Sequence, residues 1–279
     1  MIQRRLITLV GISLIVLTGC SRLTKASREP DRKLILELVA PPENRDAATN
    51  ETCAIIYSRL NALGVVADVY PQGVSANGRI VINLWGVSDI DRLKQIITSR
   101  GKLELTHVIS DPSPAPVKTY ANKKEAAESV DKSGNLPANR RVLPYSDRSE
   151  VTLSGSETTA PNLWVVVESP AIIDGTDLRT ASAVNRTGRQ DDYQIVFSLK
   201  KPGAERFGAW TTAHINEYLG VVLNDEVKSI AFIKSQIFDQ GEISGRFTKQ
   251  SAEDLALILK SGSLPFPVKI VSESTSEQK

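Results

Sequence analysis

The stretch GEISGRFTKQSAEDLALILKSGSLPFPVKIV, residues 241–271, carries the clearest secondary-structure pattern in the chain. Its beginning predicts a strand at 242–246, and Thr248 is a residue type that caps the N-terminus of a helix. Apolar residues at helical spacing predict the buried face of that helix: Ala252, Leu255, Ala256 and Leu259. Gly262 ends the helix, and two prolines precede a last strand at 268–271. A strand, a capped helix and a further strand in close succession predict an α+β fold.

Residues 34–109 predict a domain of the ferredoxin-like type. The leucines of 33–39 alternate, which indicates a half-buried strand, and Ser88 with Asp91 has the pattern of a helix capping box. The expected elements are a strand at 33–39, a helix at 46–63, strands at 65–70 and 79–84, a helix starting at Ser88 and a strand at 102–108. This β-α-β-β-α-β order is that of ferredoxin-like domains. We call this region the base.

Residues 110–160 are rich in Pro, Ser, Asn, Lys and Glu without a sustained period, and we expect an irregular linker there. Regular elements resume over 161–267, which we call the head. Its expected elements are strands at 163–167, 180–185 and 193–199, a helix from Pro202 to about Tyr218 with Ala204, Phe207, Thr211 and Ile215 on its inner face, and strands at 219–223 and 227–233. Asn224 and Asp225 tolerate the positive φ of a tight hairpin between the last two strands. The head is therefore also α+β, and a tail at 274–279 ends the chain.

The first 19 residues have the features of a cleavable export signal. Two arginines precede an apolar run at 6–17, which is well short of the ~20 residues that span a bilayer. The four residues ending at Cys20 resemble the lipobox of bacterial lipoproteins, so we expect fatty acyl chains such as palmitate on Cys20. A tether at 20–33 follows, of which the 13 polar and charged residues 21–33 reach at most ~45 Å when fully extended. Ser21, which is not the Asp that retains many lipoproteins at the inner membrane, favours the outer membrane in a bacterium with two membranes.

The rest of the chain has balanced charge. After residue 19 there remain 32 basic and 32 acidic residues, which argues against nucleic acid as a partner. No apolar run beyond Cys20 is long enough to cross a membrane, and Cys53 is the only other thiol, so no internal disulfide is expected. Burial of apolar side chains must therefore stabilise the fold.

Several segments resemble SecD, the accessory subunit of the protein-export translocase. They are, in the order found in that family, RLNALGV (59–65), RIVINLWGV (79–87), GAERF (203–207), VLNDEV (222–227) and GEISGRFT through GSLPFP (241–267). The resemblance runs from about residue 34 to the last strand, apart from the irregular middle.

The resemblance to SecD implies a ferredoxin-like base with an inserted head that engages translocating polypeptide. The last strand, near 268–273, is a candidate to return to the base. The chain stops at Lys279, where the membrane helices of SecD would begin, so we expect it to lack the proton-driven motor. A lipoprotein signal stands where SecD has its first membrane helix. Trp85 replaces a usual proline and Ser251 a usual acidic residue, which affects local geometry only.

The residues that could carry chemistry form no enzyme motif. His107 lies on a strand and His214 on a helix, without a second His, Cys or carboxylate at ligand spacing, so we predict no catalytic or metal role. Cys53 lies on an apolar stripe and is expected to be a small buried hydrophobe. Four aspartates lack the spacing of a calcium loop and are expected to be solvated: Asp174, Asp177, Asp191 and Asp192. We therefore expect no enzyme and no cofactor.

Two functions remain open from the sequence. In the first, an envelope lipoprotein binds exported or unfolded polypeptide through an apolar groove or a strand edge and assists translocation alongside Sec components. The candidate contacts are Asn224 and Asp225 in the hairpin, and Gly245 and Phe247 near the end of a strand. In the second, a structural or assembly lipoprotein uses the same fold to bind a folded envelope partner. Either function places the protein body in the envelope, facing the periplasm or the cell exterior.

Overall fold

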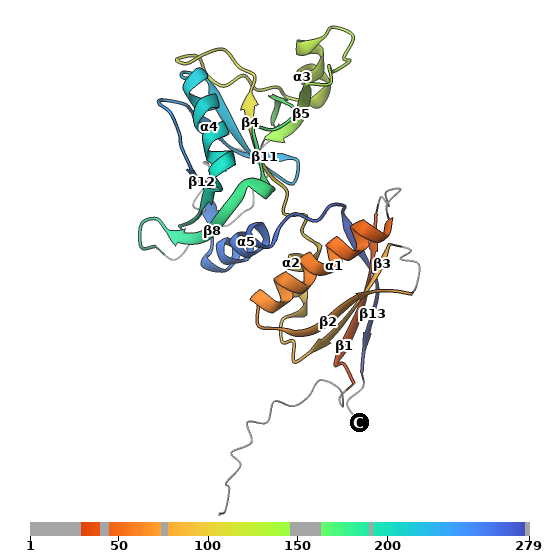
Figure 1. The fold of residues 1–279 in the computed structure, drawn as a ribbon. Helices are drawn as coiled ribbons and strands as arrows, with labels where there is room; N and C mark the ends of the chain where they lie inside the picture. Colours follow the sequence, from red (N-terminus) through yellow and green to blue (C-terminus); the bar gives the residue numbers. More distant parts are fainter. Residues whose placement is uncertain (1–28, 40–44, 74–77, 146–162, 190–191, 277–279) are drawn as a thin grey trace, which may run out of the picture.

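The computed structural model describes residues 29–39, 45–73, 78–145, 163–189 and 192–276. The export signal, Cys20, Ser21 and most of the tether lie outside these ranges, so what the sequence says of them stays a prediction. Within these ranges, no helix is both long and apolar enough to cross a bilayer. The described chain forms two parts, a base and a head (Figure 1).

The base is a four-stranded antiparallel sheet in the order β13-β1-β3-β2, with helices α1 and α2 packed against it (Figure 1). Its elements are β1 (Arg32–Leu38), α1 (Arg45–Ala62), β2 (Val66–Pro71), β3 (Arg79–Trp85), α2 (Ile90–Thr98) and β13 (Val268–Thr275). The alternating leucines Leu34, Leu36 and Leu38 are all buried in one core with the two helices. Asp89 caps α2 by accepting from the Arg92 backbone N–H at 3.0 Å, so the prediction of a Ser88 cap was wrong by one residue.

The fourth strand of the base differs from the prediction. β4 (Leu103–Val108) follows α2 but leaves the base and joins the head, where it pairs along its length with β10 (Tyr218–Leu223). In the base its place is taken by β13, which pairs antiparallel with β1. The burial of the two strands fits this exchange: β4 is buried at every position except His107, as in a sheet covered on both faces, whereas β13 is mostly exposed, as an edge strand of the base can be.

Residues 110–160 are not wholly irregular, contrary to the prediction. They contain helix α3 (Lys123–Val130), capped by Asn122, and strand β5 (Arg140–Tyr145). The helix buries only Ala126 completely, so it has almost no apolar stripe to detect. The strand begins with two arginines and contains Pro144, a residue type that argues against a strand.

The first part of the head is a sheet that closes on itself. Its strand order is β10-β11-β5-β6-β4-β7, and β10 also pairs with β4, which completes a small ring of five strands. The further bounds are β6 (Leu163–Glu168), β7 (Ile173–Asp174) and β11 (Glu226–Phe232). Valines, one leucine and Tyr218 fill the interior. Because β10 is buried at all its positions, it reads in sequence as a continuous apolar run.

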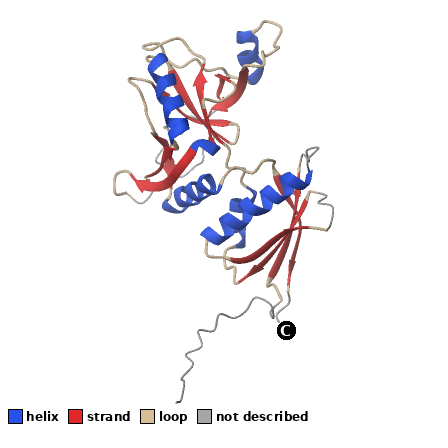
Figure 2. Ribbon diagram, viewed as in Figure 1, coloured by secondary structure: helices blue, strands red, loops and turns tan. Residues whose placement is uncertain are grey.

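The second part of the head is a three-stranded sheet in the order β12-β9-β8, packed on helices α4 and α5 (Figure 2). The bounds are β8 (Leu178–Asn185), β9 (Tyr193–Leu199), α4 (Lys201–Ala213), β12 (Gln240–Phe247) and α5 (Lys249–Ser261). Thr248 caps α5, as predicted, by accepting from the Ser251 backbone N–H at 3.2 Å. Helix α4 ends five residues earlier than predicted because the chain turns at Asn216, where φ is 73°, and Tyr218 starts β10. Phe207 and Thr211 are buried as expected, but Ile215 is 42% exposed because it lies beyond the helix.

Base and head meet around Arg59, a side chain of α1 with 0% exposure. Its guanidinium donates to the backbone carbonyls of Ile96 (2.8 Å) and Ser99 at the end of α2 and of Gly262 (2.9 Å) at the end of α5. Burial lowers the pKa of Arg59 to about 10, which still leaves the group charged at neutral pH. One cation therefore fixes both chain segments that cross between the two parts, and among the described residues its hydrogen-bond partners are carbonyls and the Ser261 hydroxyl, without a carboxylate.

Candidate polypeptide-binding surface

The hairpin predicted at Asn224 and Asp225 is confirmed. Both residues have positive φ, 53° and 62°, and they join β10 to β11 in a tight turn. The Asn224 side-chain oxygen accepts from the Lys102 backbone N–H at 3.0 Å, and the Asn224 N–H donates to the Lys102 carbonyl at 2.9 Å. The hairpin tip is thus hydrogen-bonded to the segment that leads from α2 into β4.

Asp225 serves the same attachment. Its carboxylate lies 3.0 Å from Arg100, 3.1 Å from Lys102 and 3.6 Å from Arg141, with the side chain 45% exposed. Two of these partners, Arg100 and Lys102, lie in the segment that crosses from α2 of the base to β4 of the head. Both residues of the turn therefore hold the head to the crossover segment, and this leaves less of their bonding capacity for a bound polypeptide.

The other two candidates, Gly245 and Phe247, lie in β12, on a different sheet from the hairpin. Phe247 pairs with Tyr193 of β9 and packs partly buried against the head core. Gly245 lies in the backbone segment where the pairing register shifts, between Ile243 and Phe247. Such irregularities are common at sheet edges and in functional regions. The structure thus keeps Gly245 and Phe247 together and separates them from Asn224 and Asp225.

Strand β8 forms the opposite edge of the same sheet, and within the described ranges its only strand partner is β9. Ala181 and Ala183 pack toward the core, and Thr180, Ser182 and Val184 are exposed, Val184 by 41%. An edge with small side chains lets the backbone of another chain approach closely. We call Thr180–Val184 the β8 edge.

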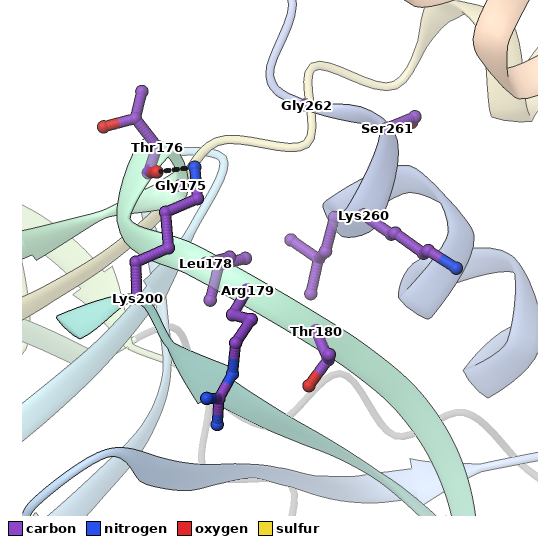
Figure 3. A pocket seen from close by; sticks show the side chains of 10 residues that line it. Gly175, Thr176, Leu178, Arg179, Thr180, Lys200, Lys260, Ser261 and Gly262 are labelled. Atoms are coloured by element: carbon purple, nitrogen blue, oxygen red, sulfur yellow. Dashed lines mark hydrogen bonds between the residues drawn. The ribbon is translucent and has the colours of Figure 1, made fainter. Parts of the chain in front are cut away.

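A shallow pocket of about 300 Å³ lies beside the start of the β8 edge, against the C-terminal end of α5 (Figure 3). Leu178, Thr180 and Leu259 supply part of its lining. Three basic residues also line it, Arg179, Lys200 and Lys260, of which Arg179 pairs with Asp239 at 3.4 Å. The Lys200 ammonium donates to the Thr176 carbonyl at 2.8 Å, which positions it at one side (Figure 3). The pocket therefore offers positive charge next to the β8 edge. It could not be recognised from the sequence, because its lining residues come from separate parts of the chain.

The remaining polar candidates have structural partners. Asp174 caps the short 3-10 helix Gly175–Asp177, and Asp177 pairs with Arg206 at 2.6 Å. Asp192 accepts from the Thr187 hydroxyl at 2.7 Å, and Asp191 lies outside the described residues. Cys53 is buried, and burial raises the pKa of its thiol to about 11, as expected of a residue that serves packing.

The prediction that His107 and His214 have no partners of the metal-ligand kind was wrong. The fold brings the two rings together, with centroids 5.3 Å apart, and Glu217 joins them. The spacing of His214 and Glu217, three residues apart, is a signal that the sequence already contained. His107 could not be connected to them before the β4–β10 pairing was known.

Comparison with known proteins gives a consistent result. The family model "SecDF, P1 head subdomain" matches residues 149–266. The protein translocase subunit SecD of Koribacter versatilis is 35% identical over 233 residues, covering 83% of this chain and 39% of the relative. SecD of Aquifex aeolicus is 35% identical over 230 residues, with 82% and 40% covered. The chain thus spans about two fifths of the length of these relatives.

Solved structures agree. A structure described as that of a membrane component SecDF that enhances protein export matches with a TM-score of 0.60 and 26% identity, covering 86% of this chain and 98% of that one. SecDF in a super-membrane-facing form matches with a TM-score of 0.63 and 25% identity, covering 87% of this chain and 30% of that one.

Proposed function

Because this chain is SecD-like over most of its length and carries a SecDF P1 head, we propose that its head binds exported or unfolded polypeptide and so assists protein translocation. The relationship to SecD implies a role in protein export and a location in the envelope, on the periplasmic side. Polypeptide binding by the head and lipid attachment at Cys20 go beyond this relationship and are proposed here for this chain.

The observation that supports the proposal most is the β8 edge. An edge strand presents backbone N–H and C=O groups that can pair with any extended chain, whatever its sequence. Export substrates share little except an unfolded backbone, so recognition through the backbone suits them. The small side chains at Ala181, Ser182 and Ala183 leave room for such pairing.

The basic pocket adds charge to this surface. Arg179, Lys200 and Lys260 lie where an extended chain along β8 would continue toward α5. They would attract carboxylates or backbone carbonyls of the bound chain, with a strength that salt reduces. The other edge, β12, with Gly245 and Phe247, is the second part of the proposed surface, whereas Asn224 and Asp225 act by fixing the head.

Site-specific crosslinking in living cells tests this function. A photo-crosslinking residue at Ser182, exposed on the β8 edge, should label many different exported chains. Ser272 is the matched control, because it is an exposed serine on β13, the edge strand of the base sheet. If the probe at Ser272 labelled exported chains as strongly as the probe at Ser182, polypeptide binding could no longer be assigned to the head. If Ser182 crosslinked mainly to one folded partner protein, that result would instead favour the structural or assembly lipoprotein.

We further propose that acylated Cys20 anchors the protein to a membrane. The variant Cys20→Ser should lose its acyl chains and move from the membrane fraction to the soluble fraction. Stable anchoring needs more than one acyl chain, and Cys20→Ser would carry none. The protein should therefore be almost completely absent from the membrane fraction. An unchanged distribution of Cys20→Ser would contradict the lipid anchor without affecting the crosslinking result.

A further inference from the structure

Four side chains from three separate segments of the chain meet at the closed sheet. His107 belongs to β4, Glu168 ends β6, His214 follows α4 and Glu217 precedes β10. One ligand atom each from His107, His214 and Glu217 lies within 4.8 Å of the others. His107 Nε2 is 2.8 Å from Glu217 Oε2. The β4–β10 ladder, in which His107 pairs with Leu219, fixes the backbone on which this contact depends.

The ring of His214 is oriented by its neighbours. Its Nδ1 lies 2.8 Å from the carbonyl oxygen of Trp210, and since a carbonyl can only accept, Nδ1 carries the proton. The lone pair of a neutral His214 is then on Nε2, the atom free to bind a metal. The Trp210 ring stacks on His214 with centroids 4.1 Å apart and planes at 14°, which restricts the rotation of the imidazole.

His107 has a carboxylate behind it. Its Nδ1 lies 3.3 Å from Glu168 Oε2, and the other oxygen of Glu168 accepts from Arg140 at 2.9 Å. The Nδ1 atom is buried and lacks a well-aligned hydrogen bond. A carboxylate on the far nitrogen of a histidine is the usual support of a metal-binding imidazole.

We propose that His107, His214 and Glu217 bind a divalent transition-metal ion of the zinc class. Zinc takes histidine nitrogens and carboxylate oxygens at about 2.0–2.2 Å, often with three protein ligands and one water. Tetrahedral ligands at that distance lie about 3.3 Å apart, so the present separations need only side-chain adjustments. All three residues are partly exposed, which gives the ion a path into the site.

Bound metal would link the end of α4 to β4 and to the start of β10. These elements belong to the head, and none of the four side chains is part of the β8 edge. The proposal therefore does not depend on polypeptide binding. The site fits a role as a metal-dependent clamp inside the head.

The test uses the full chain in detergent, purified without a histidine tag. Because the protein contains only two histidines, a Co²⁺ titration reports on this site with little background. We expect about one equivalent of Co²⁺ to produce the intense visible bands of four-coordinate cobalt, and Zn²⁺ to abolish them by displacement. The variant His214→Ala should weaken binding by about 100-fold or more, and Glu168→Gln by about 10- to 100-fold.

The control variant is Glu205→Gln, which removes an exposed carboxylate from α4 and should leave the affinity unchanged. Proton NMR of the unmodified protein provides a measurement that needs no variant to fold: Zn²⁺ should shift the ring signals of both histidines. Failure of one equivalent to bind, equal affinity in His214→Ala, or a shift of only one histidine would overturn the proposal.

Discussion

The base and the head use the same residue types but bury them differently. In β1 of the base, buried and less buried positions alternate, and the helices cover a single face of the sheet. In β10 of the head every position is buried, because the strand lies in a closed sheet with an interior of its own. The base is also continuous in sequence except for β13, whereas the head pairs strands that are far apart. The difference shows that a period of two residues identifies a strand and its face only where one face is buried.

The largest expected effect comes from Arg59, which belongs to both parts. Arg59→Ala leaves the carbonyls of Ile96, Ser99 and Gly262 without their donor and opens a cavity. We expect a loss of about 3–5 kcal/mol in the free energy of unfolding. Urea unfolding should be followed separately with Trp85 as the sole tryptophan in the base and with Trp164 and Trp210 in the head.

If the junction couples the two parts, Arg59→Ala should lower the urea midpoints reported by Trp85 in the base and by Trp164 and Trp210 in the head to the same extent. Arg59→Lys should be less damaging, since it keeps the charge but not the planar fork of donors. The exposed Arg186→Ala is the control and should change little. A shift confined to Trp85 would show that the head does not depend on the junction.

A smaller effect, restricted to the head, is expected from Gly241→Ala. A Cβ at Gly241 would collide with the ring of Phe197, which is 1% exposed. Overpacking of this kind costs about 1–3 kcal/mol. Thermal unfolding of the head probes should shift to lower temperature while Trp85 is nearly unaffected.

Gly175→Ala is the matched control, because a Cβ there meets nothing within 4 Å. If Gly241→Ala lowered the stability seen by all three tryptophans equally, base and head would unfold as one unit, and the separation drawn between them would fail for stability.

The smallest effect is expected on the surface of the base and depends on pH. Hydrogen bonding to Lys94, at 2.6 Å, and the nearby charge of Arg32 lower the pKa of Glu273 from its usual 4.5. A carboxyl whose pKa is lower in the folded state contributes stability above its unfolded pKa and loses that contribution as pH falls through the folded value. Glu273→Gln should therefore reduce the stability at neutral pH slightly and remove part of its decline below about pH 4.5.

Urea midpoints measured across the acid range, with Trp85 as the probe, check the pH effect. Glu242→Gln neutralises a carboxylate on the head sheet and should leave the acid dependence of the Trp85 signal as it is. An acid dependence of Glu273→Gln identical to that of the unmodified protein would contradict the contribution of this ion pair.

Sequence patterns predicted most elements that depend on short-range chemistry. The helix capped by Thr248, the alternating strand β1 and the turn at Asn224 and Asp225 are all where the residues indicated. Each depends on capping, periodicity or positive φ, which neighbouring residues determine. Helix α3 was missed because a short helix with Ala126 as its only fully buried residue carries no periodic signal.

The candidate binding surface was only partly predictable. A strand edge was an expected binding mode, and the candidates Gly245 and Phe247 lie on the edge strand β12. That β8 forms the other edge, beside a basic pocket, was not foreseen. Asn224 and Asp225 were proposed as contacts, yet their polar groups attach the hairpin to Lys102 and Arg100. Exposure and attachment of a loop depend on which segment packs beside it, and local sequence does not contain that information.

The sequence by itself determined the α+β class, the resemblance to SecD, the positions of most helices and strands, and the expectation of a lipid anchor at Cys20. The resemblance to SecD also made the last strand a candidate to return to the base, where β13 indeed pairs with β1. The tertiary structure alone decided that β4 leaves the base for the head, that Arg59 holds the junction, and that His107 meets His214 and Glu217. The physical reason is the separation in sequence over which each interaction acts. Caps, turns and periodicity act over a few residues, whereas strand pairing and the desolvation of buried polar groups depend on contacts between residues more than a hundred positions apart.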